Sequence, residues 1–364
     1  KEIKKVNAMM YKKYNKEKKR KNIPESEYLV KMEDDNNILE FDNLQTNFFT
    51  DNGTVKAVNG VSFNIPKGST VGVVGESGCG KSVTSLSTMR LLQGPQGQIV
   101  GGQIRFNNKN TGKAVDITKL PMTEMQKLRG NEIAMIFQEP MSSLNPVFTI
   151  GAQLSEPIEL HSPDLKKEDV KKKVIELLKL VGIADAEGVY NRYPHELSGG
   201  MKQRIVIAMA LSCDPQLIIA DEPTTALDVT IQAQILDLLR GLKDKINASI
   251  MLITHDLGVV ASMCDYVVVM YAGRVIEQGT VQEIFKDPRH PYTIGLIKSL
   301  PSMNTDSDKL YSIPGNVPNP INMPNHCYFK NRCDRCIDKC SGDYPEFVDI
   351  TNEHKVSCHL YDNN

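Results

Sequence analysis

An eight-residue loop at positions 75–82 constrains the fold of this chain more than any other feature. It follows an apolar run, residues 69–74, precedes a helical pattern that starts at Lys81, and reads Gly-Glu-Ser-Gly-Cys-Gly-Lys-Ser. Between a strand and a helix, this pattern is typical of a phosphate-binding loop, whose glycines let backbone N–H groups converge on phosphate oxygens beside a helix N-terminus. We therefore expect Lys81 to reach the β- and γ-phosphates of a nucleotide and Ser82 to ligate Mg²⁺. The alternative is a chance glycine-rich turn.

A second apolar run, residues 216–220, ends in two carboxylates, Asp221 and Glu222. An acidic residue at the end of a buried strand is a common second support for Mg²⁺ in proteins that hydrolyse nucleotides. A carboxylate one residue further along is placed to orient or deprotonate an attacking water. A polar strand end before a turn would also explain these two residues, but their occurrence with the phosphate loop favours the catalytic interpretation.

Short apolar runs alternate with helical patterns along most of the chain, which predicts an α/β domain around a largely parallel sheet. From residue 150 to 181 the pattern is wholly helical, with apolar residues at spacings of three and four, and indicates an inserted helical subdomain. After about residue 286, five prolines between Pro301 and Pro324 and then a cluster of cysteines indicate a separate loop-rich module. The strand candidates are residues 39–44, 57–65, 69–74, 132–137, 216–220, 249–254 and 266–270.

Charge is distributed unevenly in this chain of 364 residues and net charge -1. Residues 1–22 contain ten lysines and arginines against two glutamates, and residues 1–36 show no sustained period, which predicts a mobile tail or a frayed helix. We favour a solvated tail over contact with anionic lipid, and we expect no nucleic acid partner. No run of about 18 apolar residues is present, and no apolar block follows the N-terminal charges, so we expect no membrane span, no signal peptide and a reducing compartment.

Four motifs in order carry a resemblance to a known family. The stretch from Leu197 to Arg204 reads Leu-Ser-Gly-Gly-Met-Lys-Gln-Arg and resembles the signature motif of ATP-binding cassette (ABC) proteins. Gln138 is similar to the glutamine of the family's Q-loop, residues 226–228 (Ala-Leu-Asp) to its D-loop, and His255 to its switch histidine. In the residues themselves, Ser198 and the following glycines open a helix, which makes a second anion-binding terminus.

The resemblance implies a head-to-tail dimer in which each ATP lies between one subunit's phosphate loop and the other subunit's signature motif. It implies catalytic roles for Glu222, His255, Gln138 and Lys81, and an adenine-stacking aromatic that we assign to Phe49, with Phe48 nearly equal to it. Because Cys79 lies beside Lys81 and a helix N-terminus, we expect a lowered thiol pKa and a block of ATP binding on alkylation. The expected nucleotide contacts are Phe49, Gly75, Glu76, Ser77, Gly78, Cys79, Gly80, Lys81, Ser82, Val83, Gln138, Asp221, Ser198, Gly199 and Gly200, with Ser82, Gln138 and Asp221 at Mg²⁺.

Within the family, residues 138–146, 290–293 and 313–318 resemble the ATPases of dipeptide and oligopeptide importers. The resemblance implies an ATP-hydrolysing subunit on the cytoplasmic face of the cell membrane. Its partners would be a second related ATPase, two membrane permease subunits and an extracytoplasmic solute-binding protein. The alternatives are an importer of nickel or another small solute, and a non-transport ABC ATPase.

Five of the eight cysteines lie in the last forty residues. The spacing of Cys327, Cys333, Cys340 and Cys358 resembles a C-terminal pattern of this branch that is associated with a 4Fe-4S cluster. Four thiolates suit either an iron-sulfur cluster or Zn²⁺, and the spacing matches neither ferredoxins nor zinc ribbons, so the chemistry leaves the metal open. Cys336 could form an alternative ligand pair with Cys333. We favour a structural role over redox sensing because a short Pro-rich segment needs a staple.

The expected architecture is thus an α/β P-loop NTPase cassette of the ABC type with an inserted helical subdomain and a small C-terminal cysteine-rich module. Its expected parts are a basic flexible extension (1–36), an ABC ATPase domain (37–285) with its helical subdomain at about 145–205, and a Pro/Cys-rich module (286–364).

Overall fold

The structure, a computed structural model, describes residues 2–20, 22–138, 143–225, 227–300 and 311–362. The chain divides into two compact units, the first made of residues 1–65, 70–121 and 253–364 and the second of residues 66–69 and 122–252. Residues 139–142 of the peptide-importer motif and Ala226 of the D-loop lie outside the described residues. Within the described ranges, no helix combines the length and the apolar character needed to cross a membrane.

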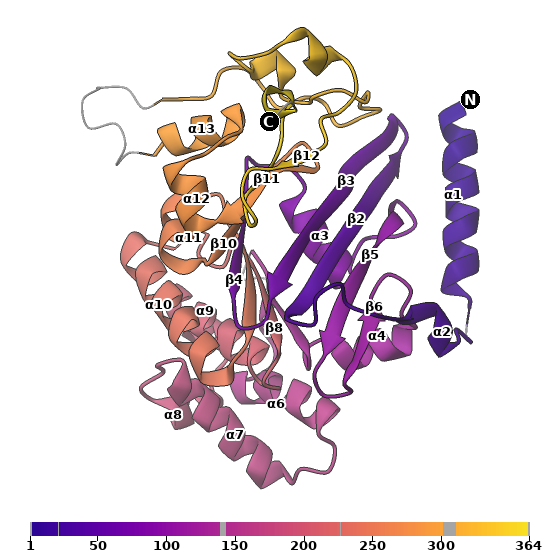
Figure 1. The fold of residues 1–364 in the computed structure, drawn as a ribbon. Coiled ribbons are helices and arrows are strands. Elements are labelled where there is room, and N and C mark those ends of the chain that lie inside the picture. The colour runs from indigo at the N-terminus through magenta and orange to yellow at the C-terminus, as the bar shows by residue number, and fades with distance from the viewer. Residues whose placement is uncertain (1, 21, 139–142, 226, 301–310, 363–364) are drawn as a thin grey trace. The chain divides into compact units, whose positions relative to one another are not determined.

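The first unit contains an antiparallel sheet with strand order β1-β6-β5-β2-β3 (Figure 1). Its long strands β2 and β3 have 14 residues each, and their inward side chains form a core in which the rings of Phe41 and Phe63 stack at 4.4 Å. The sequence predicts only parts of these strands, because their outer faces are polar and interrupt the apolar runs. The elements are β1 (Leu29–Val30), β2 (Asn37–Thr50), β3 (Gly53–Pro66), β5 (Gly97–Asn108) and β6 (Lys113–Asp116).

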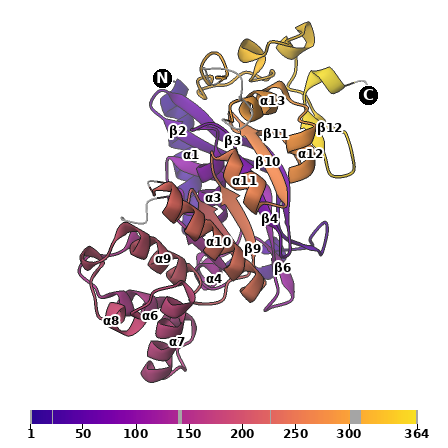
Figure 2. The ribbon, with the colours of Figure 1, turned by 90° about the vertical axis from the view of Figure 1, so that its left-hand side faces the viewer.

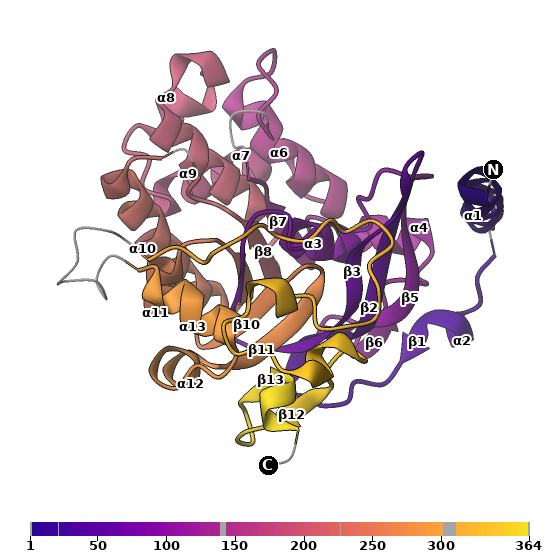
Figure 3. The ribbon, with the colours of Figure 1, turned by 90° about the horizontal axis from the view of Figure 1, so that it is seen from above.

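A second set of strands in this unit has the order β12-β13-β11-β10-β4. Strand β4 pairs in parallel with β10, and β10 forms an antiparallel hairpin with β11. The short strand β13 adds to β11 from the C-terminal segment, which lies alongside this hairpin in Figure 3. The elements are β4 (Thr70–Val74), α3 (Lys81–Thr88), α11 (Leu257–Met263), β10 (Tyr266–Tyr271), β11 (Arg274–Thr280), α12 (Val281–Lys286), α13 (Pro291–Lys298), the 3-10 turns η3 (Lys330–Arg332), η4 (Asp338–Ser341) and η5 (His359–Tyr361), β12 (Phe347–Asp349) and β13 (Lys355–Ser357).

The basic N-terminal segment, expected to be a mobile tail or a frayed helix, is a helix over most of its length. Residues Glu2–Lys18 form helix α1, followed by the short helix α2 (Glu25–Tyr28). Asn7 Nδ2 donates to the carbonyl of Thr50 at 3.0 Å, and the Tyr11 hydroxyl donates to the carbonyl of Phe49 at 2.9 Å. These residues, one turn apart, form a stripe that seats the helix on the end of β2, while its lysines point outward. The sequence hides this stripe because Asn and Tyr do not register as apolar positions.

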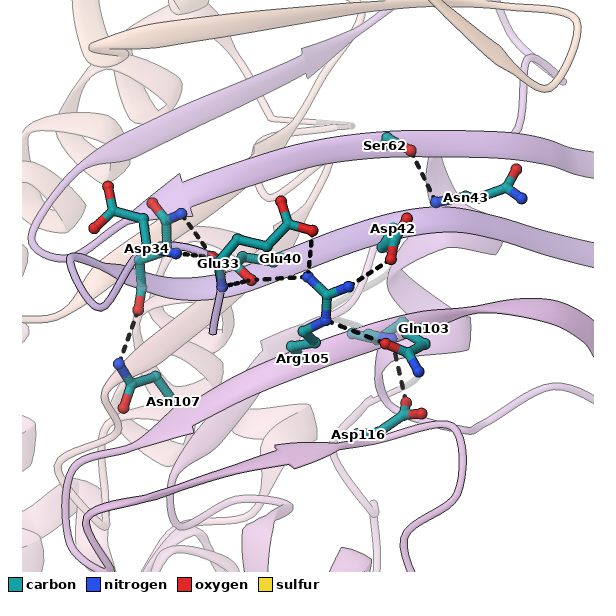
Figure 4. A network of polar contacts seen from close by, with 12 residues as sticks. Glu33, Asp34, Glu40, Asp42, Asn43, Ser62, Gln103, Arg105, Asn107 and Asp116 are labelled. Carbon is teal, nitrogen blue, oxygen red and sulfur yellow. Dashed lines mark hydrogen bonds and ion pairs between the residues drawn. The ribbon is translucent and has the colours of Figure 1, made fainter. Parts of the chain in front are cut away.

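A charged network joins residues 33–42 to strand β5 (Figure 4). Arg105 of β5 bonds to the carboxylates of Glu33 at 2.8 Å and of Glu40 at 3.3 Å, and it pairs with Asp42. Burial alone would raise the pKa of Glu40, but hydrogen bonds from Asn37 and from the backbone N–H groups of residues 33 and 34 hold it below its usual range. The network therefore fixes the start of β2, which leads into the sheet.

The second unit holds strands with the order β9-β8-β7, together with helices. Strands β7 and β8 pair in parallel, β8 and β9 are buried at every position, and β7 is buried at three of four. Helices α6, α7, α8 and α9 follow one another and pack together (Figure 2), where the sequence predicts a helical region. Val170, Val174, Leu177 and Leu178 of α7 are buried as the spacing predicts. The elements are α4 (Met122–Leu128), β7 (Ile133–Ile136), α6 (Ile150–His161), α7 (Lys167–Leu180), α8 (Ala186–Tyr190), the 3-10 turn η1 (Pro194–Glu196), α9 (Gly199–Ala210), β8 (Leu217–Asp221), α10 (Val229–Ile246) and β9 (Ser249–Ile253).

Candidate functional site

The predicted phosphate loop lies between β4 and α3 in the first unit. Ser77 and Gly78 lie in the loop, and Ser82 and Val83 lie in the first turn of α3. Strand β4 is buried at all five positions, and helix α3 begins at Lys81 after Gly80, whose φ is 102°. A Cβ at Gly75 would come within 2.2 Å of the Met270 carbonyl oxygen. Only glycine therefore allows the loop to turn this tightly against β10. The ammonium of Lys81 bonds to the carbonyls of Gly75 at 2.7 Å and of Glu76 at 3.1 Å, which places its charge at the centre of the loop.

His255 follows strand β9 and belongs to the same unit as the phosphate loop. The backbone N–H of the preceding residue, Thr254, donates to the carbonyl of Val73 at 3.3 Å, and Val73 lies two residues before Gly75. Asp256 caps helix α11 by accepting from the backbone N–H of Gly258 at 2.8 Å. The exposed His255 is thus held between two fixed neighbours at the end of β9, beside the strand that leads into the loop.

In the second unit, Gln138 and the two carboxylates meet at the ends of adjacent strands. Strands β7 and β8 pair in parallel with Ile136 opposite Ala220, so Gln138 and Glu222 each lie two residues beyond a paired position. Gln138 Nε2 donates to Glu222 Oε2 at 2.9 Å, as the register requires. The structure thus brings these two predicted catalytic residues together, and their catalytic roles stay a prediction.

Glu222 is held in an unusual conformation. Its φ of 48° lies in the left-handed region, which non-glycine residues rarely adopt. The hydroxyl of Thr225 donates to the same carboxylate oxygen at 2.9 Å, so two side chains fix its direction. Asp221, the last residue of β8, is only 4% exposed. A strained, doubly held carboxylate next to a buried one suits a group that must aim at a water.

The signature stretch forms the start of helix α9. Ser198 is its N-cap, and the serine hydroxyl accepts from the backbone N–H of Met201 at 3.4 Å. Ser198 and Gly199 are exposed, so the N–H groups of the first turn are accessible to an anion. Gln203 of this helix is fully buried and its amide donates to the carbonyl of Pro223, the residue after Glu222. This contact links helix α9 to the residues that follow β8, and the sequence motif does not predict it.

The two aromatic candidates for adenine stacking differ in exposure. Phe49 is 4% exposed and its ring is part of the core, whereas Phe48 is half-buried. A buried ring offers no face to a nucleotide base, so the structure does not favour Phe49 as the assignment and points to the alternative, Phe48. Alternation along strand β2 explains the difference, since neighbouring residues face opposite sides of the sheet.

Cys79 also differs from expectation. Its side chain is 1% exposed, and burial raises the pKa of the thiol although the nearby Lys81 ammonium opposes this effect. The expected lowering of the pKa is therefore wrong, because the loop packs its sulfur inward against the cassette core. The residue serves as a small group that fits the turn.

We expect Cys79 to resist alkylation in the folded protein. Iodoacetamide at pH 8 should modify the exposed Cys336 at least about tenfold faster than Cys79, since thiol reactivity needs both access and thiolate. A time course of peptide mass spectrometry measures both rates in one sample, and denaturant provides the control in which the rates converge. Equal rates in the folded protein would contradict the buried placement.

Comparisons with known proteins cover most of the chain. The family described as "ABC transporter" matches residues 58–225, and the family described as "Oligopeptide/dipeptide transporter, C-terminal region" matches residues 276–340. The "Oligopeptide transport ATP-binding protein AppD" of Bacillus subtilis (strain 168) is 50% identical over 325 residues, which are 89% of this chain and 97% of that protein. This chain belongs to the ABC transporter ATP-binding proteins. The family resemblance predicted from the motifs is confirmed.

Two further similarities agree with this membership. The "Dipeptide transport ATP-binding protein DppD" of Bacillus subtilis (strain 168) is 48% identical and covers 89% of this chain and 95% of that protein. Among solved structures, the dimeric post-hydrolysis state of the ATP-binding cassette MJ0796, bound to ADP and Pi, aligns with a TM-score of 0.58 at 26% identity. The alignment covers 67% of this chain and 98% of the MJ0796 chain. The α/β cassette fold and the assignment as an ABC ATPase are therefore established.

Four cysteines of this ABC ATPase lie near one another in the C-terminal segment. Burial raises the pKa of Cys327 to about 12, and the nearby thiols of Cys340, Cys358 and Cys333 raise it further. Burial likewise raises the pKa of Cys358 to about 11, again with help from Cys333 and Cys340. Cys336 is exposed, and its thiol is hydrogen-bonded to that of Cys340. Within the described residues, no three or more His, Cys, Asp or Glu side chains are arranged to hold a metal ion, so the structure does not support the metal-site prediction.

Proposed function

We propose that this ABC ATPase powers the import of peptides across a membrane by hydrolysing ATP. The observation that carries the catalytic part is the hydrogen bond from Gln138 to Glu222 at the ends of two parallel strands, directly after the buried Asp221. The peptide substrate class rests on relatives named for oligopeptide and dipeptide transport, which match about nine-tenths of the chain. Nickel and other small solutes, the alternatives, have no comparable support.

The proposed roles follow from the local geometry of each group. The glycine turn and the Lys81 ammonium bind the phosphates, and Phe48 stacks on the base. Glu222, aimed by Gln138 and Thr225, accepts the proton of the attacking water. His255, fixed at the end of β9, contacts the γ-phosphate.

Mg²⁺ is the metal that ATP brings to such a site, and its chemistry there is to neutralise phosphate charge. Ser82 at the start of α3 and Asp221 at the end of β8 are oxygen donors of the kind that Mg²⁺ prefers, and Gln138 adds an amide oxygen. These residues would hold the ion, whereas the water is activated by Glu222.

The exposed N-terminus of helix α9 suits a nucleotide held by a second ATPase subunit. Ser198 caps the helix, and a Cβ at Gly199 would meet no atom within 4 Å, so the terminus is open. We propose a head-to-tail dimer with a related ATPase, in which this terminus completes the partner's site. A homodimer is the alternative, and measured subunit composition distinguishes the two.

Two permease subunits and a solute-binding protein complete the proposed importer, with this subunit peripheral on the cytoplasmic face. The surface for the permease is the segment that follows the Q-loop, where Val147 and Phe148 are 70% and 54% exposed. Neighbouring exposed apolar side chains of this kind are typical of a protein interface. The adjoining helices α6 to α9 form the proposed helical subdomain (about 145–205), and residues 1–36 and 286–364 are the proposed extension and C-terminal module.

Affinity purification of the tagged full-length chain from detergent-solubilised membranes tests the transport function. Two permeases, a second ATPase and a peptide-binding protein should co-purify, and ATP turnover should rise when peptide and binding protein are added to the reconstituted complex. A complex whose turnover responds to nickel, or a soluble partner without permeases, would contradict the proposal.

We further propose that Cys327, Cys333, Cys340 and Cys358 bind a 4Fe-4S cluster that staples the C-terminal module. Their proximity and the burial of Cys327, Cys340 and Cys358 support this proposal, since soft thiolate ligands in a largely buried site suit iron-sulfur clusters, with Zn²⁺ as the alternative. Adoption of ligand geometry would require the thiols to move together from their present arrangement.

Iron, zinc and acid-labile sulfide analysis of the anaerobically purified chain tests the cluster. We expect iron with sulfide in the wild type and in Cys336→Ser, and loss of both in Cys358→Ser, because only the buried thiol is a ligand. Zinc without sulfide would replace the cluster with a zinc site, and a metal-free wild type would refute both.

A further inference from the structure

The second residue of the phosphate loop, Glu76, is held by the C-terminal part of the chain. Arg332 forms a two-pronged ion pair with its carboxylate, with Nη1 to Oε2 at 2.6 Å and Nη2 to Oε1 at 3.0 Å. The backbone N–H of Glu76 donates to the hydroxyl of Tyr292 in helix α13 at 2.8 Å. Both contacts lie within the first unit and span more than 200 residues of sequence.

Arg332 occupies a socket built for its guanidinium group. Its side chain is only 4% exposed, and Nε donates to the carbonyl of Pro314 at 2.9 Å. The guanidinium also lies 5.7 Å from the ring centroid of Tyr271 and 5.8 Å from that of Phe329. Gly315, with a φ of +77°, passes so close that a Cβ there would lie 3.2 Å from Arg332 Cγ. The proline-rich segment 313–318 therefore serves to enclose this arginine.

The pairing matters because the loop binds anions. A phosphate loop attracts nucleotide through backbone N–H groups and a lysine, so a carboxylate on that loop repels the triphosphate unless it is neutralised. The ion pair with Glu76 is the largest influence on Arg332, raising the pKa of its guanidinium against the opposing effect of burial. The arginine is charged at every physiological pH, and its two-pronged contact fixes the carboxylate in direction as well as in charge.

We propose that Arg332 is a positioning residue of the ATPase site: it neutralises and orients the Glu76 carboxylate, so that ATP affinity depends on the C-terminal module. The inference rests on the proposed nucleotide site. It adds to that site a residue that lies 256 positions from Glu76 in the sequence. Arg332 immediately precedes Cys333, so any rearrangement of the cysteine cluster acts on the residue that holds the loop.

A double-mutant cycle on the full-length chain tests the proposal, with the dissociation constant of Mg-ATP measured by calorimetry. Arg332→Gln should weaken ATP binding about tenfold, because it leaves a carboxylate unpaired beside the phosphates. Because Arg332 acts through the Glu76 carboxylate, Arg332→Gln made in the Glu76→Gln background should change the dissociation constant by less than about twofold relative to the Glu76→Gln single variant. Arg332→Lys, which keeps the charge but loses the fork, should bind within about threefold of the wild type.

A purely structural role of Arg332 gives a different pattern: Arg332→Gln weakens ATP binding about as much in the Glu76→Gln background as it does in the wild type. That result, or unchanged binding in Arg332→Gln, would overturn the proposal. Arg335→Gln is the matched control, because it removes the same charge from an exposed position of the same module and should leave binding unchanged. Lys81→Ala tests the nucleotide site itself. If this variant still binds ATP, the assignment of the site fails. If it loses ATP binding while Arg332→Gln binds ATP as the wild type does, only the role of Arg332 is refuted.

Discussion

Glu222→Gln is expected to lower ATP turnover by the assembled importer by about a hundredfold to a thousandfold while ATP stays bound. The amide has the shape of the carboxylate and can still accept hydrogen bonds from Gln138 and Thr225, but it cannot take a proton from water. The left-handed backbone at position 222 is unaffected, since Gln and Glu carry the same Cβ substituents. Phosphate release from the complex in vesicles measures turnover, and the nucleotide retained after rapid filtration should be ATP.

The control for this experiment is Glu176→Gln, the same change at an exposed position of helix α7 in the same unit. It should leave turnover unchanged. If turnover in Glu222→Gln stays within about threefold of the wild type, Glu222 is not the general base, because general-base catalysis contributes more than that. Retained ADP in place of ATP would contradict the role equally, since it would show that cleavage still occurs.

The buried parallel strands could be predicted from sequence because most of their positions are apolar. Residues 69–74 and 249–254 are predicted strands and agree with β4 and β9 to within one residue. Glu222 was placed at a strand end by the same pattern and Gln138 by the resemblance to the Q-loop, and the pairing of β7 with β8 puts both residues two positions beyond a paired one. The contacts of helix α1 with β2 could not be predicted, because they come from Asn7 and Tyr11, which a hydrophobic pattern does not register.

Three properties of the site depend on tertiary packing and could not be predicted from the motifs. The thiol of Cys79 was expected to be activated by Lys81, but burial outweighs the nearby charge. Which of Phe48 and Phe49 is accessible depends on the register of β2, and a pair of adjacent aromatics does not specify it. The partner of Glu76 lies in a segment that reads as loop, so no local pattern predicts Arg332.

One buried carboxylate of strand β11 contacts both the start of helix α13 and the C-terminal segment. Glu277 of β11 is fully buried and accepts from the backbone N–H groups of Arg289 at 2.6 Å and His290 at 2.9 Å, and its other partner is His354 Nε2 at 2.8 Å. The segment that carries Tyr292 to the phosphate loop is therefore anchored at its start by this carboxylate. We therefore expect the stability of this junction to determine how firmly Arg332 and Tyr292 hold Glu76.

This junction gives the protein a specific sensitivity to acid. His290 is 2% exposed, and its Nδ1 accepts from the backbone N–H of Tyr292 at 3.0 Å as the cap of helix α13. Burial lowers the pKa of His290 to about 4, although Glu277 opposes this effect. The unfolded chain, with an ordinary His pKa near 6.5, therefore binds the proton first as pH falls. The contribution to stability is complete above about pH 6.5 and is lost progressively toward pH 4.

His290→Asn should remove this loss, because the Asn side-chain oxygen can cap the helix but does not titrate. From pH 7.5 to pH 4.5 we expect the wild type to lose about 2.5 kcal/mol more unfolding free energy than the variant. Guanidinium unfolding followed by far-UV circular dichroism measures this, since the chain has no tryptophan for a fluorescence signal. His195→Asn, at an exposed histidine, should lose stability as the wild type does. An equal loss in His290→Asn would show that the buried imidazole is not what destabilises the junction in acid.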